Sequence, residues 1–233
     1  MKILVTGATG YIGKRIIPML VNEGHFVVCA VRDKLRADKH YLEEEHIEIV
    51  EADFLNTSKD FESLETQCAI NFKSYIETTQ VKQVIYLSGI TNEEKLSKHL
   101  RSRKNVEQAL ASKKYALTTF KAGIIVGSGS SSFEIIRDLV EKLPVMIAPK
   151  WLHTKTQPLA VRDVLAFLSN AKGNKALYNQ SYDIFGPEIL TYKQMLLQFA
   201  EVRKLKRYIL TVPVMTPKLS SYWLYFVTST SYK

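Results

Sequence analysis

The hydrophobic positions of the chain alternate between short continuous runs and longer stretches with helical spacing. Continuous apolar runs occupy residues 3–6, 26–31, 47–50, 84–87 and, interrupted by a glycine, 117–126, and such runs are typical of strands buried on both faces. Between them, residues 11–22, 61–79 and 93–112 carry apolar side chains three or four positions apart, which predicts helices. Strands that alternate with helices predict an α/β fold with a parallel sheet covered on both faces.

The pattern changes after Gly127. A capping box, Ser131-Ser132-Phe133-Glu134, predicts the start of a helix, and further helices are expected at residues 162–171 and 191–203. Short strands are expected at residues 157–161 and 182–185, and residues 217–232 are rich in aromatic side chains. We therefore expect a large first domain, residues 1–127 with 156–186 at its sheet edge, and a small α/β lobe formed by 128–155 and 187–233.

One connection is too short for this fold. Only seven residues separate Asp53, at the end of the third strand, from Phe61, at the start of the next helix. A doubly wound sheet requires a helix, a strand and two loops there, on the order of 20 residues or more. Either this half is abbreviated or a segment is absent from the sequence, and we favour absence. An abnormal separation of consecutive Cα atoms near residues 55–58 would show it.

Composition restricts the class of protein. The chain has 233 residues, 46% of them hydrophobic, and a net charge of +9 whose basic residues are scattered rather than gathered in one stripe. This favours a surface with one anion pocket over nucleic-acid binding. We expect no membrane segment, since no run reaches the roughly 18 to 20 apolar residues that one needs. The two cysteines lack metal-ligand spacing, and we expect no metal, no signal peptide and a cytoplasmic location.

The opening stretch, MKILVTGATGYIG, carries the clearest chemical signal. Gly7 would let the chain turn sharply out of the first strand, Gly10 would let the backbone approach a pyrophosphate, and Gly13 would let the helix pack against the strand. The start of the helix then offers amides and a positive dipole end to the phosphates. The predicted phosphate site comprises Gly7, Thr9, Gly10, Tyr11, Ile12 and Gly13.

The end of the second strand bears on the choice of dinucleotide. Arg32 comes first there, and its guanidinium can pair with the 2′-phosphate of NADP, which favours NADP over NAD. The alternative is that Arg32 is solvated and that Asp33 holds the ribose of NAD. Asp53, after the third strand, is expected either to accept a hydrogen bond from the adenine amino group or to cap a helix.

Together these residues resemble the short-chain dehydrogenase/reductase superfamily, and most of all its atypical and extended members, the NmrA-like and NAD-dependent epimerase/dehydratase-like proteins. The matching segments span nearly the whole chain: TGATGYIG (6–13), VRD (31–33), ADF (52–54), VIYLSGI (84–90), HLRSRKNVEQAL (99–110), GIIVGSGSSSFE (123–134), TQPLAVRDV (156–164) and DIFGPEILTY (183–192). The resemblance implies a Rossmann-type doubly wound parallel sheet with a small C-terminal α/β lobe over the nicotinamide.

The resemblance also implies a catalytic Ser, and a Tyr followed four residues later by Lys. Ser88 stands at the serine position and also near the cofactor, whereas His99 and Arg103 replace the Tyr and Lys. His99 is a candidate acid/base because imidazole titrates near neutrality, with Arg103 beside it. We favour the plainer interpretation, an exposed helix start, in which Arg103 pairs with Glu107. Tyr86 is expected to belong to the core.

Two functions remain open. The first is an NADP-dependent oxidoreductase- or epimerase-like enzyme acting on an unidentified small molecule. Its substrate pocket is expected to include His153 and the terminal aromatic residues. The second is a non-catalytic NADP-binding sensor or assembly factor with a protein partner, suggested by the missing Tyr/Lys pair. A nucleic-acid-binding protein is the least favoured of the functions considered.

Overall fold

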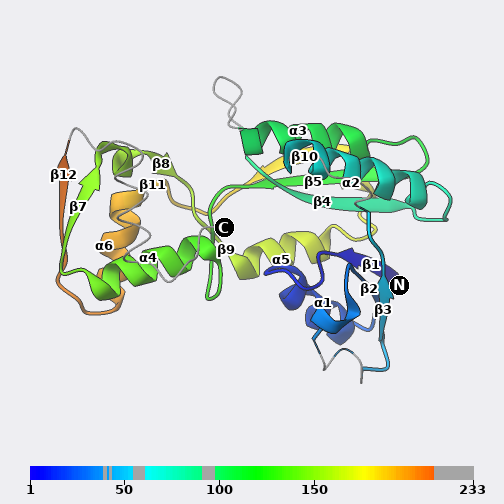
Figure 1. Cartoon of the computed structure of the whole chain (residues 1–233), viewed down its shortest axis with the longest axis horizontal. Coiled ribbons are helices and arrows are strands. Elements are labelled where there is room, and N and C mark those ends of the chain that lie inside the picture. Colours follow the sequence, from blue (N-terminus) through cyan, green and yellow to red (C-terminus); the bar gives the residue numbers. More distant parts are fainter. Residues whose placement is uncertain (39–40, 42–43, 55–60, 91–97, 213–233) are drawn as a thin grey trace. The chain divides into compact units, whose positions relative to one another are not determined.

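The computed structural model describes residues 1–38, 41, 44–54, 61–90 and 98–212, with the backbone alone described for 61–63 and 98–101. The chain forms two compact units (Figure 1). The larger unit comprises Met1–Ala122 and Arg162–Ile184, and the smaller unit comprises Gly123–Val161 and Phe185–Lys233. Residues 55–58, where we expected an abnormal Cα separation, and the aromatic stretch 217–232 lie outside the described residues.

The first sheet of the larger unit consists of three parallel strands in the order β1-β2-β3. They are β1 (Lys2–Thr6), β2 (Phe26–Val31) and β3 (Ile47–Glu51). Helix α1 (Gly13–Asn22) packs on this sheet through Ile17 and Leu20, which lie in one buried cluster with Val27 and Cys29 of β2. This cluster fixes the start of α1 close to the carboxyl end of β1, where a Rossmann-type fold binds its ligand.

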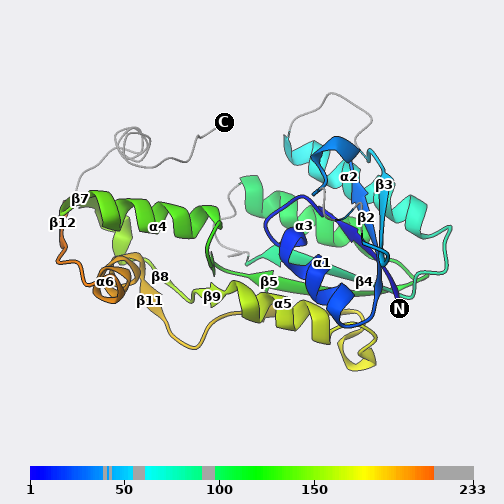
Figure 2. The ribbon, with the colours of Figure 1, turned by 90° about the horizontal axis from the view of Figure 1, so that it is seen from below.

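The second sheet of the larger unit is also parallel, in the order β10-β5-β4. Its strands are β4 (Gln83–Gly89), β5 (Ala116–Ala122) and β10 (Gln180–Ile184). Helices α2 (Phe61–Ile76) and α3 (Lys98–Leu110) cover one face and α5 (Val161–Asn170) the other (Figures 1 and 2). Side chains of β5 point alternately to the two faces of the sheet. Leu117 packs in the cluster of α2 and α3 on one face, and Phe120 contacts Phe167 of α5 on the other.

The described parallel strands of the larger unit therefore form two three-stranded sheets rather than one continuous sheet. Among the described residues, β1 and β4 pair with β2 and β5 respectively and with no strand on their other edges. In the doubly wound order 3-2-1-4-5-6 the strand next to the first one joins the two halves of the sheet. The connection between β3 and α2 is where that strand would be encoded, and it contains too few residues to supply it.

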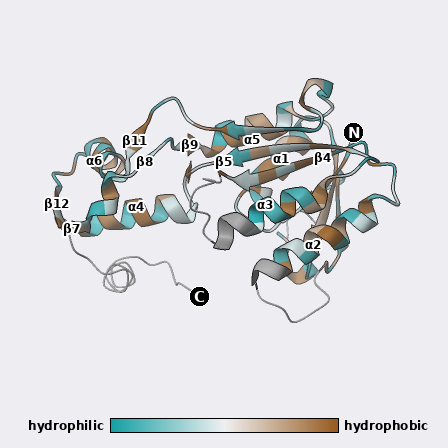
Figure 3. Ribbon diagram, turned by 90° about the horizontal axis from the view of Figure 1, so that it is seen from above, coloured by the Kyte–Doolittle hydropathy of each residue, from teal (hydrophilic) through white to brown (hydrophobic). Residues whose placement is uncertain are grey.

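The smaller unit is built from short strand pairs and two helices. Its core joins α4 (Ser131–Lys142) and α6 (Tyr192–Val202) to β7 (Val145–Pro149) and β12 (Tyr208–Val212), which pair in parallel. Both helices show mixed hydrophobic and hydrophilic segments in Figure 3, as expected of helices that bury one face. The smaller unit also contains β6 (Ile125–Val126), β8 (Lys155–Thr156), β9 (Leu159–Ala160), β11 (Leu190–Thr191) and the short 3-10 helix η3 (Lys150–His153). Two further 3-10 helices, η1 (Lys34–Arg36) and η4 (Lys175–Leu177), belong to the larger unit.

The start of α4 differs from the predicted pattern by one residue. Helix α4 begins at Ser131, and the capping oxygen is that of Ser130, which accepts from the backbone N–H of Phe133. The predicted capping box is therefore displaced by one residue, while Glu134 still accepts from a preceding amide, that of Gly129.

Within the part of the chain that the structure describes, every helix is too short or too polar to cross a lipid bilayer.

Candidate dinucleotide site at the β1–α1 turn

The turn between β1 and α1 is shaped by the three glycines. Gly7 has a φ of +68°, a left-handed conformation that residues with a side chain rarely adopt. The amide of Gly10 donates to the carbonyl of Gly7 over 2.9 Å, which closes the turn. A Cβ on Gly13 would lie 2.2 Å from the carbonyl oxygen of Gly7, so only glycine allows α1 to start so close to the strand. Thr9 is exposed in this turn.

The first turn of α1 leaves amides available to a ligand. Ile12 occupies the N-cap position and makes no side-chain hydrogen bond, because it has no oxygen to accept one. The amides of Lys14 and Arg15 donate to the carbonyls of Gly10 and Ile12 respectively, each over 3.0 Å. The first amides of a helix have no acceptor within the helix, and an anionic group bound at this end is stabilised by these amides and by the helix dipole.

Tyr11 lies in the same turn and has an unsatisfied polar atom. Its ring packs against the guanidinium of Arg15, 4.0 Å from the ring centroid, and Arg15 also donates to the carbonyl oxygen of Tyr11 over 2.9 Å. The Tyr11 hydroxyl is buried and has no hydrogen-bond partner among the described residues. Buried hydroxyls are normally bonded, so this oxygen fits a site whose remaining partner is a bound ligand.

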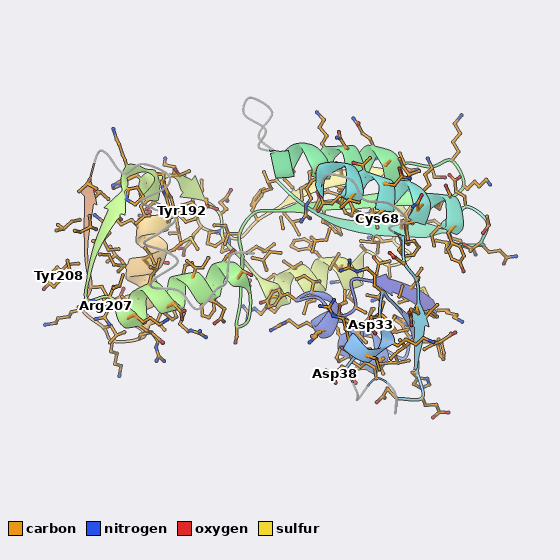
Figure 4. All side chains as sticks on the ribbon, in the orientation of Figure 1. Asp33, Asp38, Cys68, Tyr192, Arg207 and Tyr208 are labelled. Carbon is orange, nitrogen blue, oxygen red and sulfur yellow. The ribbon has the colours of Figure 1, made fainter. Side chains whose placement is uncertain are left out.

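At the end of β2 the two candidate ribose residues differ in their surroundings. Asp33 caps η1 and accepts from the amide of Leu35 over 2.9 Å, so part of its carboxylate is already used locally (Figure 4). Arg32 is exposed at the strand tip. An exposed guanidinium at the carboxyl end of a parallel strand provides a positive group for a phosphate-bearing ligand.

Asp53 follows β3, and α2 begins eight positions later at Phe61, so Asp53 does not cap that helix. It lies near Cys68 of α2, labelled in Figure 4, and its charge raises the pKa of that thiol after the larger effect of burial. The positive charge of Arg32 lowers the same pKa. The ends of β2 and β3 are neighbours in the sheet, where Val31 pairs with Glu51, so Arg32 and Asp53 follow adjacent strand ends.

A second polar group occupies the end of β4. Ser88 is buried there, and Tyr86 lies two positions earlier on the same face of the strand. The Tyr86 ring lies in the core cluster as expected, while its hydroxyl oxygen accepts hydrogen bonds from Ser88 and from Arg103 of α3. Burial raises the pKa of Tyr86 despite these two donors, so the phenol keeps its proton at neutral pH and can donate it in a hydrogen bond.

The other predicted catalytic positions lie on α3. His99 is in its first turn, and its side chain lies outside the described residues. Arg103 is exposed and reaches Tyr86, and Glu107 forms an ion pair with Lys121 of β5 over 3.2 Å rather than the expected pair with Arg103. The Tyr86–Arg103 contact was missed because it joins a strand to the following helix, and the sequence does not show how that helix lies against the strand.

His153, the predicted pocket residue, lies in η3 of the smaller unit and contacts the Thr211 hydroxyl at 3.4 Å. Next to it, Trp151 packs edge-on against Tyr192 with 5.5 Å between ring centroids. His153 and Trp151 therefore contact other residues of the smaller unit.

Residues 1–111 match the model of the NmrA-like family. No curated protein sequence matches the chain significantly. Among solved structures, the chain resembles UDP-glucuronic acid 4-epimerase from Bacillus cereus, in complex with UDP-glucuronic acid and NAD, at 15% identity and a TM-score of 0.71, covering 99% of this chain and 95% of the epimerase. It also resembles Gre2 from Candida albicans in complex with NADPH (16% identity, TM-score 0.70, 99% and 95% covered) and WbmG from Bordetella bronchiseptica in complex with NAD (12%, 0.70, 100% and 90%).

The family match and the fold agree with the geometry of the β1–α1 turn. The chain has the Rossmann-type fold of these solved structures, and its residues 1–111 are similar to the NmrA-like family.

Proposed function

We propose that this protein binds a nicotinamide dinucleotide, with a preference for NADP, and acts as an oxidoreductase- or epimerase-like enzyme on a small molecule. The observation that carries the proposal is the β1–α1 turn, where Gly13 has no room for a Cβ and the Tyr11 hydroxyl lacks a partner among the described residues. Relatives in fold were solved with NAD and with NADPH, which supports this class of ligand.

The residues of the turn would hold the pyrophosphate through backbone amides. Arg32, exposed at the end of β2, would pair with a 2′-phosphate, while Asp33 is engaged in capping η1. The bound cofactor would supply hydride transfer. We assign the substrate side to Ser88 and Tyr86, with Arg103 holding the Tyr86 hydroxyl in place. The protonated phenol of Tyr86 can donate to the oxygen of a carbonyl or alcohol substrate, while Ser88 and Arg103 donate to the phenol oxygen.

A second candidate function is a nucleotide-dependent sensor or assembly factor without turnover. The observation that favours it is the pair His99 and Arg103 on α3, where active relatives are expected to carry Tyr and Lys. Such a protein would bind the dinucleotide in the same turn and change its affinity for a protein partner.

Cofactor choice is tested by titrating NADPH and NADH into the chain and into Arg32→Ala. A lost charge-assisted contact costs roughly 1.5–3 kcal/mol, so we expect NADPH affinity to fall about 10- to 100-fold and NADH affinity to change little. Lys113→Ala is the matched control, because it removes an exposed positive charge just before the amino end of β5. Equal affinity of the unaltered chain for NADH and NADPH would refute the assignment of Arg32.

Turnover is tested by following the absorbance of the reduced nicotinamide with a panel of quinones, aldehydes and nucleotide sugars. Activity that falls in Ser88→Ala and in Tyr86→Phe supports the enzyme. Tight NADPH binding without turnover of any compound, together with a cofactor-dependent change in partner binding, would favour the sensor. Activity that is unchanged in both variants would refute the assigned substrate side.

We further propose that the protein works in the cytoplasm. Cys29 and Cys68 are both free thiols in the structure, as is usual in a reducing compartment. Cell fractionation with detection of the tagged chain tests this, and recovery from an oxidising compartment would contradict it.

A further inference from the structure

The guanidinium of Arg103, at the assigned substrate side, has more hydrogen-bond donors than its contact with Tyr86 uses. Arg103 is exposed on α3 and donates to the Tyr86 phenol oxygen. A guanidinium carries five N–H donors, so several remain after this contact. Glu107, one helical turn further along α3, forms its ion pair with Lys121 over 3.2 Å. Arg103 therefore has no ion pair among the described residues.

The other carboxylate near this site is bonded to a different residue. Glu65 of α2 lies close enough to Tyr86 for its negative charge to raise the pKa of the phenol. Its oxygen Oε2 accepts from the hydroxyl of Ser102, a fully buried residue of α3, over 2.5 Å. Within the described residues, neither Glu65 nor Glu107 neutralises Arg103, so its guanidinium is suited to bind an anionic group of a ligand.

We propose that the substrate carries a carboxylate next to its carbonyl group, and that Arg103 binds this carboxylate. The inference rests on the proposed function, because it concerns the same substrate side. A guanidinium presents its N–H groups in a planar fork, which matches the two oxygens of a carboxylate with two parallel hydrogen bonds.

The contact between Arg103 and Tyr86 limits how far apart the two substrate groups lie. The phenol oxygen accepts from Arg103 and would donate its own proton to the carbonyl oxygen of the substrate. Hydrogen-bonded heavy atoms are about 2.7–3.2 Å apart, so the carbonyl and the carboxylate bind to two side chains that contact each other. This spacing favours a 2-oxo or a 3-oxo acid, in which at most one carbon separates the carbonyl from the carboxylate.

Reduction of such an acid gives the corresponding hydroxy acid. The cofactor of the proposed function supplies a hydride to the carbonyl carbon and is oxidised, and Tyr86 supplies a proton to the carbonyl oxygen. The C=O double bond becomes a C–OH single bond, and water returns a proton to the phenol. Arg103 holds the carboxylate and transfers no proton, because a guanidinium stays protonated in proteins.

Chemical labelling of arginine tests the carboxylate site without turnover. Phenylglyoxal modifies accessible guanidinium groups, and mass spectrometry of the digested chain measures the label on each arginine. Oxamate, an analogue of a 2-oxo acid, is the probe, and ethyl oxamate is its uncharged counterpart. At roughly ten times its dissociation constant, oxamate should slow the labelling of Arg103 about tenfold, with or without NADPH, and ethyl oxamate should not. Arg162 is the matched control, because its side chain is 87% exposed on α5 and its labelling should not change.

Steady-state kinetics separate the carboxylate contact from the support that Arg103 gives to Tyr86. The substrates are pyruvate and methyl pyruvate, which share a carbonyl group and differ in charge. In Arg103→Gln the ratio of kcat/KM for the acid to that for the ester should fall about 10- to 100-fold, because a charge-assisted contact is lost. Tyr86→Phe should lower both values and leave the ratio unchanged, and Arg162→Gln should leave both values unchanged.

The two measurements distinguish failure of this inference from failure of the proposed function. NADPH binding together with labelling of Arg103 that oxamate does not slow would overturn the carboxylate site and leave the proposed function standing. Equal protection by ethyl oxamate, or an acid-to-ester ratio that is unchanged in Arg103→Gln, would also overturn it. Protection of Arg103 by oxamate in a folded chain that binds no NADPH would support the carboxylate site and refute the proposed function.

Discussion

The replacement Tyr11→Phe is expected to stabilise the free protein and to weaken its binding of NADPH. The variant keeps the ring that packs on Arg15 and removes only the hydroxyl, which is buried and has no partner among the described residues. An unsatisfied buried hydroxyl costs about 1–3 kcal/mol. We therefore expect the free energy of unfolding without cofactor to rise by about 1 kcal/mol.

With saturating cofactor, this gain in stability should disappear, because weaker binding of NADPH lowers the stabilisation by the ligand by about 1 kcal/mol. If a group of the dinucleotide bonds the Tyr11 hydroxyl, the variant loses one hydrogen bond of about 1 kcal/mol, which raises the dissociation constant roughly fivefold. Urea unfolding with and without saturating NADPH measures both effects, because a ligand that binds only the folded state stabilises it in proportion to RT ln(1 + [L]/Kd).

Tyr75→Phe is the matched control, since Tyr75 of α2 is 60% exposed and should show neither effect. A Tyr11→Phe protein that is less stable than the parent without cofactor would show that the hydroxyl already has a partner. Unchanged NADPH affinity would show that the hydroxyl does not face the ligand. Either result would remove Tyr11 from the proposed site.

Three further predictions concern the larger unit. Gly13→Ala should lower the free energy of unfolding by roughly 1–3 kcal/mol in urea titrations, because its Cβ would overlap the carbonyl of Gly7. Glu23→Gln should cost about 0.5–1 kcal/mol at pH 7, since hydrogen bonds from Lys172 first and then Ser169 lower the pKa of Glu23 in the folded state. This difference in unfolding free energy should be complete above pH 4.5, the ordinary pKa of a glutamate, and should disappear as the pH falls through the lowered pKa of the folded state; a pH-independent difference would contradict the ion pair. Burial raises the pKa of Cys29 from 9.0 to about 11, so it should stabilise the fold below pH 9 and lose that contribution as the pH rises through 11, and native thiol labelling at neutral pH should modify Cys68 before Cys29.

The sequence predicts the elements whose signal is local. The continuous apolar run at 26–31 coincides with β2, and the glycine turn with its following helix appears as expected, although α1 starts at Gly13. The Rossmann-type α/β class is confirmed. Strands β7 and β12 were not predicted, because each is stabilised by pairing with a partner more than 60 residues away. Their polar and apolar positions indicate a strand only when the pairing partner is known.

The sequence also predicts only part of the candidate site. The phosphate turn depends on backbone conformation, which glycine spacing specifies locally, so Gly7 and Gly13 could be assigned from sequence. The hydrogen bonds from Ser88 and Arg103 to Tyr86 depend on how α3 lies against β4, and the ion pair of Glu107 depends on β5. Contacts between separate elements leave no repeating pattern in the sequence. The sequence therefore indicated the positions of these residues but not the partners that they contact.

Isothermal titration calorimetry of NADPH into the intact, folded chain tests the central claim most directly. The account predicts saturable heat at one cofactor per chain and a lower affinity in Arg32→Ala. Absence of heat with the oxidised and reduced forms of both nicotinamide dinucleotides, from a chain whose circular dichroism shows a folded α/β protein, would contradict it.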